Sequence, residues 1–381
     1  MSYQPLPDVR KTLRVNWYRY PIEGARLREL SKRSDLQGWL QAGGHVALFA
    51  LTGTVAYLFW AQQNWLGFVL ALFIHGTVGS FFVGTAPHEL GHGTVFRTKR
   101  LNRIFLYGIS LLSWWDPFNY AASHTYHHRY TLYPEGDREN LLPLDPSPRP
   151  ALLIQLFTVN LFGRPARNFS KGGLFWTIWV TCLGAVGKHA PADAPITEWL
   201  EALHADQPAE HRKSIIWSRI LLGFHGTVFV VSIATGQWAL PLLLTFFPFI
   251  GNWGTFSLGL TQHCGLRNNV PDFRKNSRSM TLNPLAEFLY WRMNWHIEHH
   301  MYAGVPCYNL KKLAREIADD MPKPRTLVGA WREMLDTWRR QKSEPRYQFD
   351  TPLPPGAKSS RKDAPDAIES SIGELAPEGL R

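Results

Sequence analysis

One stretch of the chain joins an apolar segment of membrane length directly to a metal-binding pattern. Residues 65–96 read WLGFVLALFIHGTVGSFFVGTAPHELGHGTVF, and the last part contains the pattern H-E-x-x-H. On a helix, His88 and His92 lie one turn apart on the same face, so both imidazoles can bind one metal ion while Glu89 activates a water molecule. Taken alone, this pattern predicts a zinc protease. The segments around it favour a different interpretation.

The composition favours a membrane protein. Of the 381 residues, 45% are hydrophobic and 13% aromatic, and Trp occurs 16 times, which suits a protein with many rings at a water–lipid interface. Four segments reach the roughly 20 apolar residues that cross a bilayer. They are residues 39–60, 65–85, 215–235 and 238–260, and none contains Asp, Glu or Lys. Short uncharged links at 61–64 and 236–237 join them in pairs, which predicts two membrane hairpins.

Basic residues beside these segments predict their orientation. The N-terminal 38 residues contain eight Lys or Arg, and the stretch after the second segment contains Arg97, Lys99, Arg100 and Arg103. By the positive-inside rule, both regions lie in the cytoplasm. The net charge of +11 would also suit a nucleic-acid-binding protein, but the basic residues flank apolar segments and do not form one tract. We therefore expect no nucleic acid partner.

The remaining segments complete the expected organisation. Residues 1–38 form a basic cytosolic segment without the apolar core of a signal peptide, and 39–342 form the membrane domain. The tail, 343–381, is rich in Pro, Ser and charge and is expected to be disordered. Shorter apolar runs at 104–115, 151–162 and 174–186 are expected in the interface or in a cytosolic cap. Cys182, Cys264 and Cys307 are isolated, which fits a reducing compartment.

Two more histidine motifs follow the first. SHTYHHRYTLYPEGD contains His124, His127 and His128, and NWHIEHHMYAGVP contains His296, His299 and His300; both have the pattern H-x-x-H-H. On a helix, each pattern presents its imidazoles to one side. With His88, His92 and His263, which follows the fourth apolar segment, nine of the 15 histidines belong to the set.

Nine imidazoles are too many for one protease zinc, which uses three protein ligands. They suit two metal ions with four or five nitrogens each, and imidazole is a favourable ligand for non-haem iron that keeps a position open for oxygen. The predicted topology places all the motifs on the cytosolic side of the membrane, where they can converge. We therefore expect an all-α membrane protein with four transmembrane helices in two hairpins and a cytosolic helical cap that holds a histidine-rich di-metal site.

These motifs resemble the histidine boxes of the membrane fatty acid desaturase and hydroxylase superfamily. The resemblance runs over about residues 39–310, and WHIEHHMYAGVPCYNL is its most specific piece. It implies two iron ions that use O2 to attack an unactivated C–H bond. The implied ligands are His88 and His92 from the first box, His124, His127 and His128 from the second, His296, His299 and His300 from the third, and His263 as an additional ligand.

Some features of the boxes differ from the usual pattern. Glu89 stands where acyl desaturases usually have Asp, and HTYHH does not match the N-x-x-G-H-H box of membrane alkane hydroxylases. The third box looks closest to bacterial members grouped with desaturases, some of which are implicated in rhizopine breakdown by oxidative demethylation. We expect a fatty acid (acyl lipid) desaturase. The alternatives are a hydroxylase or oxidative demethylase of a small amphiphilic substrate, a membrane zinc metalloprotease based on HELGH, and a metal transporter.

The chemistry also implies supporting groups and partners. Neutral imidazoles need acceptors at their second ring nitrogen, and we expect Glu89, Asp137 and Glu298 to supply carboxylates near the boxes. The sequence has no H-P-G-G haem motif and no cysteine set for an iron–sulfur cluster, so we expect a ferredoxin, rubredoxin or cytochrome, with its reductase, to donate electrons. His45, His75 and His225 fall within apolar segments, where structural hydrogen bonding or a role in lining a substrate tunnel are the alternatives.

Overall fold

The computed structural model describes residues 3–139, 150–163, 172–192, 194 and 196–358. The first part of the chain contains α1 (Leu6–Thr12), α2 (Gly24–Leu30), α3 (Asp35–Gly38), the π-helical turn η1 (Trp39–Gly43), α4 (Gly44–Ala61), α5 (Trp65–Ser80), α6 (Thr85–Gly91), α7 (Lys99–Leu112) and α8 (Pro117–Tyr130).

The second part is also almost entirely helical. It contains α9 (Pro150–Phe157), α10 (Leu174–Ala185), α11 (Thr197–Asp206), α12 (Pro208–Thr235), α13 (Ala239–Leu244), η2 (Phe247–Phe249), α14 (Trp253–Gly259), η3 (Leu260–Gln262), α15 (Phe273–Asn276), α16 (Pro284–Leu289), α17 (His296–Met301), α18 (Cys307–Glu316) and α19 (Leu327–Gln341). The strands β1 (Met280–Thr281) and β2 (Arg325–Thr326) pair in parallel, with Met280 opposite Arg325.

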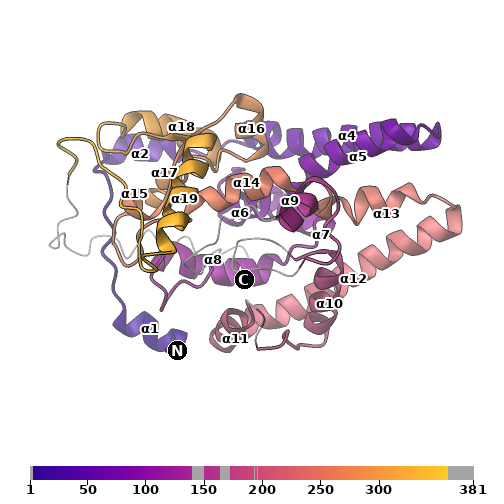
Figure 1. Cartoon of the computed structure of the whole chain (residues 1–381), viewed down its shortest axis with the longest axis horizontal. Coiled ribbons are helices and arrows are strands. Elements are labelled where there is room, and N and C mark those ends of the chain that lie inside the picture. Colours follow the sequence, from indigo (N-terminus) through magenta and orange to yellow (C-terminus); the bar gives the residue numbers. More distant parts are fainter. Residues whose placement is uncertain (1–2, 140–149, 164–171, 193, 195, 359–381) are drawn as a thin grey trace.

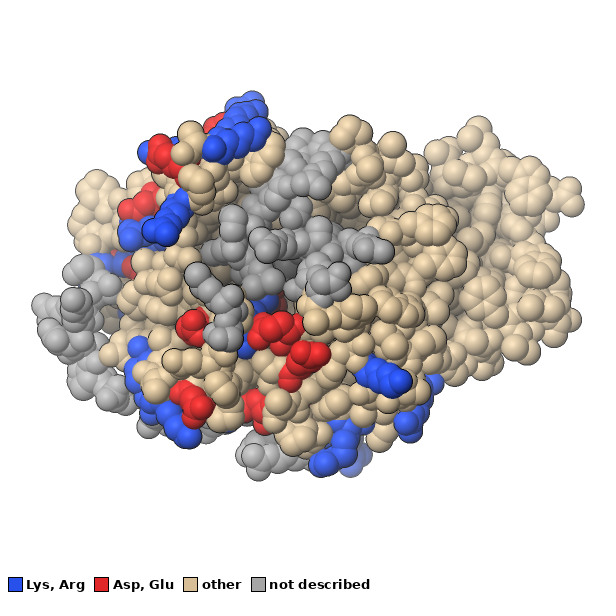
Figure 2. Space-filling model, turned by 60° about the horizontal axis from the view of Figure 1, so that its bottom comes forward, with Lys and Arg blue, Asp and Glu red and all other residues tan. Residues whose placement is uncertain are grey.

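Three helical stretches are long and apolar enough to cross a membrane: Asp35–Ala61, Trp65–Gly91 and Pro208–Thr235. They project to one side of the molecule, where α4 lies beside α5 and α12 beside α13 (Figure 1). Large apolar side chains on these helices face outward, including Leu58, Leu70 and Ile233. At the right-hand end of the face in Figure 2, the visible side chains are neither acidic nor basic. This distribution fits an integral membrane protein.

The predicted fourth span, residues 238–260, is not one continuous helix. The structure divides it into α13, η2 and α14. Pro248 has no N–H to donate to a helix, and Gly251 adopts the left-handed φ of 57°. The expectation of four continuous spanning helices is therefore corrected to three, together with a broken segment that packs against α5 and α12.

Side chains of neighbouring segments bond the polar groups at this break. His75 Nε2 lies 2.9 Å from the carbonyl oxygen of Leu243, and the indole N–H of Trp114 donates to the carbonyl of Thr245 at 3.0 Å. His225 Nδ1 lies 3.0 Å from the hydroxyl of Thr245. Irregular backbone is tolerated at membrane depth only where protein groups satisfy it. These two intramembrane histidines therefore have a structural role, as does His45, which bonds the carbonyl of Val78.

Several of the other helices, among them α2, α15, α17 and α18, form the compact end of the molecule at the left of Figure 1. Its main core joins apolar side chains of α5 and α6 to those of α17 and α18, including Val78, Leu90, Ile297 and Leu310. The short apolar runs predicted at 104–115, 151–162 and 174–186 are the helices α7, α9 and α10. None of these three is among the helices long enough to span a membrane.

The chain after Ser343 was expected to be disordered, but its first part packs on this end of the molecule. The amide of Phe349 donates to the carbonyl of Gly265 at 2.8 Å, and Thr351 is fully buried. Lys275 donates to the carbonyl of Thr351. The segment through Lys358 is therefore part of the folded domain, while 359–381 lie outside the described residues.

Candidate metal centre

Four elements bring the predicted histidines together. The chain turns at Gly84, which has a positive φ of 78°, and starts α6, so that His88 and His92 lie just beyond the end of α5. The second box lies on α8, whose N-cap Asp116 accepts hydrogen bonds from the amides of Phe118 and Asn119. His263 follows η3, and the third box forms α17.

All nine histidines fall into two groups. In each group, the potential ligand atoms lie within 4.8 Å of one another. The group of five contains His88, His92, His124, His128 and His299, and the group of four contains His127, His263, His296 and His300. Neither group corresponds to a single box, because the second and third boxes each contribute to both.

Helix geometry explains how the boxes divide. Successive residues turn by about 100°, so the residue at i+4 lies about 40° from residue i and the residue at i+3 about 60° to the other side. Accordingly, His124 and His128 point into the group of five, and His127, at i+3, joins the group of four. On α17 the same rule places His296 and His300 in one group and His299 in the other. Two such helices can therefore hold two adjacent sites.

Within each group, Nε2 atoms face one another. The Nε2 atoms of His92 and His124 are 3.2 Å apart, and so are those of His128 and His299. In the group of four, Nε2 of His296 lies 2.9 Å from that of His263 and 3.1 Å from that of His300. Nitrogens bound to one ion at about 2.1 Å would lie roughly 3 Å apart at a right angle, so these spacings suit a shared metal.

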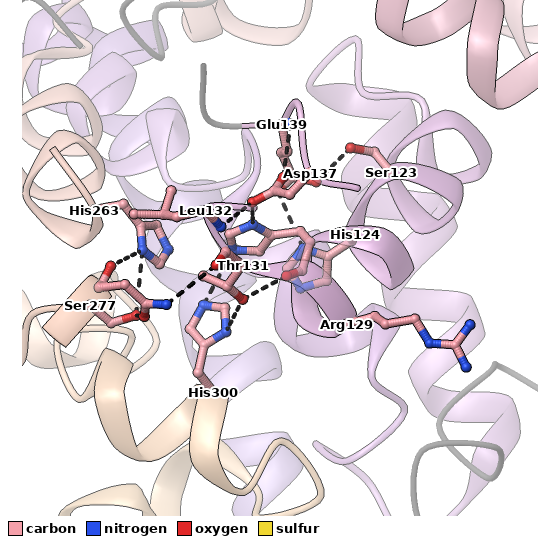
Figure 3. A network of polar contacts seen from close by, with 12 residues as sticks. Ser123, His124, Arg129, Thr131, Leu132, Asp137, Glu139, His263, Ser277 and His300 are labelled. Atoms are coloured by element: carbon pink, nitrogen blue, oxygen red, sulfur yellow. Dashed lines mark hydrogen bonds and ion pairs between the residues drawn. The ribbon is translucent and has the colours of Figure 1, made fainter. Parts of the chain in front are cut away.

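Acceptors on the other side of the rings identify which nitrogen carries the proton. His127 Nδ1 lies 2.9 Å from Oδ2 of Asp137, and His124 Nδ1 lies 3.3 Å from Oε1 of Glu139 (Figure 3). His263 Nδ1 lies 2.8 Å from the carbonyl of Asn276. A proton on each Nδ1 leaves the Nε2 lone pair pointing inward. Converging lone pairs with no hydrogen between them can bind a shared cation.

Glu89 serves the group of five in the same way. Its Oε1 lies 3.0 Å from Nδ1 of His88 and 3.5 Å from Nδ1 of His299. The other nitrogen of His88 is buried and has no hydrogen-bond partner within the described part of the chain. Buried polar atoms normally have a hydrogen-bond partner. A buried imidazole nitrogen that lacks one and lies among other imidazoles is therefore available to bind a metal ion. The donor set therefore fits iron, which imidazole binds well.

The surroundings keep these rings neutral. Burial lowers the pKa of His92 to about 4, and burial together with the nearby His127 lowers the pKa of His263 to about 3. His127 is the exception. Burial lowers its pKa, but the charge and hydrogen bond of Asp137 outweigh that effect and raise it. Neutral imidazoles are the form that binds metal.

The comparison with known protein families agrees with this geometry. The model of the family described as fatty acid desaturase matches residues 63–330, a range that contains all nine histidines. The chain belongs to the fatty acid desaturase family. It is therefore an enzyme of the desaturase and hydroxylase superfamily of oxidoreductases. No curated protein matches it.

The acids predicted near the boxes of this desaturase-family protein differ in their placement. Glu89 and Asp137 contact imidazoles, as expected. Glu298 contacts no imidazole among the described residues, and its carboxylate accepts a hydrogen bond from the hydroxyl of Ser279. It follows His296 by two positions, about 200° around the helix, and so faces the opposite side.

Sequence reasoning missed Glu139. Its Oε1 lies beside His124, and its Oε2 accepts a hydrogen bond from the hydroxyl of Ser123 at 2.6 Å. Burial raises the pKa of Glu139 to about 7. The signal was present, because Glu139 follows Asp137 by two residues in YPEGDRE. Only the turn after α8, which brings this segment back along the helix, reveals that each carboxylate meets a different ring.

A cavity of about 780 Å³ reaches the metal centre. Its walls include the imidazoles of His88, His124 and His296, the rings of Trp115 and Tyr120, and the carboxylate of Glu139. A volume of this size is in the range that holds a drug-sized ligand. His45, His75 and His225 are absent from the described lining, so their interpretation as tunnel residues is not favoured.

Proposed function

We propose that this desaturase-family protein is an O2-dependent di-iron membrane oxidoreductase that attacks an unactivated C–H bond, and that its reaction is the desaturation of a fatty acyl lipid. The observation that carries the proposal is the pair of histidine groups whose Nε2 atoms converge while their Nδ1 atoms meet acceptors. One iron ion would be held by the group of five and the other by the group of four. When bound, the two ions supply the electrons that activate O2.

The residues of the chain perform the supporting tasks. The carboxylates of Glu89, Asp137 and Glu139 orient the imidazoles and offset the positive charge of ions held by neutral ligands. The cavity positions the substrate against the centre, and its burial keeps bulk water from the reacting carbon. Because desaturation and hydroxylation begin with removal of the same hydrogen, a hydroxylase or oxidative demethylase acting on a small amphiphile is the second candidate.

The protease interpretation of HELGH is disfavoured by the position of Glu89. A protease base must reach a metal-bound water, but Oε1 of Glu89 lies 3.0 Å from Nδ1 of His88 and 3.5 Å from Nδ1 of His299, so it is engaged by these two rings. His88 and His92 also share their group with three further histidines. A transporter is disfavoured because the nine histidines lie at or beyond the ends of the long apolar helices and not midway along them.

We further propose that the centre and both termini are cytoplasmic, with the links at 61–64 and 236–237 on the outer face. A soluble ferredoxin, rubredoxin or cytochrome would then reach the compact end, while lipid substrate enters from the bilayer side. Single cysteines at Gln62 and Gly236 should react with an impermeant thiol reagent added outside cells. Labelling of either position only after the cytoplasm is opened would overturn this topology.

The experiment that tests the activity combines metal analysis with product analysis. The purified protein should contain about two iron ions, and it should convert an acyl lipid to a product two mass units lighter when a donor system and O2 are supplied. His299→Ala should lose iron and product, whereas His75→Phe, at a histidine outside both groups and outside the described cavity lining, should keep both. A protein with one zinc ion and peptidase activity would refute the proposal. A product 16 mass units heavier would favour the hydroxylase.

A further inference from the structure

A third set of histidines lies apart from the metal centre. His189 follows α10, His204 is in the last turn of α11, and His211 is in the first turn of α12. Their potential ligand atoms lie within 4.8 Å of one another, although the three residues come from separate elements. All three line the same cavity as His88 and His124. The fatty acid desaturase assignment gives them no role.

The hydrogen bonds of His204 leave one nitrogen without a proton. Its Nε2 lies 2.7 Å from Oδ1 of Asn119, and an amide oxygen can only accept, so Nε2 carries the hydrogen. Nδ1 of His204 therefore presents a lone pair, and Nε2 of His189 lies 2.7 Å from it.

The second ring offers a lone pair as well. Oε1 of Glu201 lies 3.9 Å from Nδ1 of His189, and a carboxylate on that side favours a proton on Nδ1. Nε2 of His189 then faces Nδ1 of His204 with no hydrogen between them. With the proton on Nδ1 of His189, both lone pairs are available to one cation, as in the metal centre.

The third ring packs against the second. The ring of His211 stacks on that of His204, with centroids 3.8 Å apart and planes 9° apart. One ring nitrogen of His211, which is half-buried, lies within 4.8 Å of the potential ligand atoms of His189 and His204, so a tilt of this ring can bring it to the same point.

We propose that His189, His204 and His211 form a third metal site, which binds a divalent cation of the zinc class at the wall of the cavity. An all-imidazole set without thiolate or carboxylate selects Zn²⁺, Cu²⁺ or Ni²⁺ over Mg²⁺ and Ca²⁺. Three protein ligands leave a fourth position for water or for an anionic group in the cavity. Asn119 and Glu201 act on the outer nitrogens, as Asp137 does in the metal centre.

The ion would connect α8, α11, α12 and the segment after α10 through one point. Asn119 lies on α8, five residues before His124, so the third site lies on the helix that also carries the second box. A cation there would brace this part of the cavity wall. The role is in the structure of the cavity and does not depend on electron transfer, because zinc has no redox chemistry.

The test uses the full-length protein with its iron in place. After incubation with excess Zn²⁺ and removal of unbound metal, the wild type should retain about one zinc ion more than the variant carrying His189→Gln and His211→Gln, at the same iron content. His211→Gln alone leaves the contact of His189 with His204 intact and should weaken zinc binding at least about tenfold. It provides the measurement if the double variant does not fold.

Several outcomes separate this proposal from the proposed function. Equal zinc retention by the wild type and both variants would overturn the third site, because the zinc would then be lodged among the nine histidines. No retained zinc in any of them would equally overturn it and leave a metal-free hydrogen-bonded cluster. Absence of iron, with the zinc difference preserved, would refute the di-iron proposal and leave the third site standing.

Discussion

Seven of the nine histidines of the metal centre and all three within the apolar helices are buried, but the two classes are bonded differently. His127 and His75 are each 1% exposed, so burial does not distinguish a ligand from a structural residue. His75 uses Nε2 on the carbonyl of Leu243 and Nδ1 on the hydroxyl of Thr52. His127 uses Nδ1 on Asp137 and directs Nε2 at another imidazole. What identifies a ligand is a nitrogen that faces only other ligands.

The largest expected effect comes from removing an inward-facing nitrogen. His263 stands outside the boxes, yet its Nε2 lies 2.9 Å from that of His296. His263→Ala should therefore lower bound iron and turnover as severely as His299→Ala, by at least about 100-fold in turnover, because the ligand contributes to both affinity and geometry. Iron analysis and product formation measure the change. A folded His263→Ala protein with two iron ions and full turnover would leave eight ligands.

A smaller effect is expected from the acceptor behind a ligand. Asp137→Asn replaces the carboxylate that bonds His127 Nδ1, and it should reduce metal affinity or activity roughly 10–100-fold. Glu298→Gln is the matched control, since this buried carboxylate contacts no imidazole among the described residues. Chelator competition followed by activity assays measures both. Equal losses in the two variants would show that any buried acid near the boxes matters, whatever it contacts.

The sequence predicted which histidines gather at the centre better than it predicted which of them belong to the same group and which acids contact them. Spacing placed each box on a helix and brought all nine histidines to one side of the apolar segments. The structure does bring them together. His127 and His299 each join a different group from the other histidines of their box because successive residues turn by about 100°. This division becomes visible only once the orientation of both helices is known. Glu139 escaped notice because its partner depends on how the chain returns after α8.

The fold was likewise predicted only in part. Long apolar segments gave three of the helices, because their length and composition alone determine that they can span a bilayer. The fourth segment has the composition of a span but contains Pro248 and Gly251, and it is broken there. The mean hydropathy of a segment does not reveal such a break, because it averages over all of its residues. The side chains that bond the carbonyls at this break come from other parts of the chain, His75 from α5 and Trp114 from the turn after α7. They therefore give no local signal.

Acid should lower the folding stability of the metal-free protein. The pKa of His263 falls from an ordinary 6.5 to about 3 in the fold, so the unfolded chain binds the proton more readily. This group's contribution is complete above pH 6.5 and is lost as pH falls toward 3, by roughly 2 kcal/mol between pH 7 and pH 5. Thermal unfolding of chelator-treated protein at the two pH values measures the loss. His263→Gln should show a weaker pH dependence, and an unchanged one would contradict the assignment.

The smallest effect on chemistry is expected from a structural histidine. His75→Phe keeps a ring between Phe49 and Phe247 but leaves the carbonyl of Leu243 without its partner. An unsatisfied buried acceptor costs about 1–3 kcal/mol, so the thermal midpoint should fall by several degrees. Iron content per folded molecule should stay at two and turnover should change less than about twofold, because His75 does not line the described cavity. Loss of iron from a His75→Phe protein that still unfolds cooperatively would mean that the broken segment sets the position of His263, which follows it in the chain. The two classes of histidine would then be coupled through the backbone between Leu243 and His263.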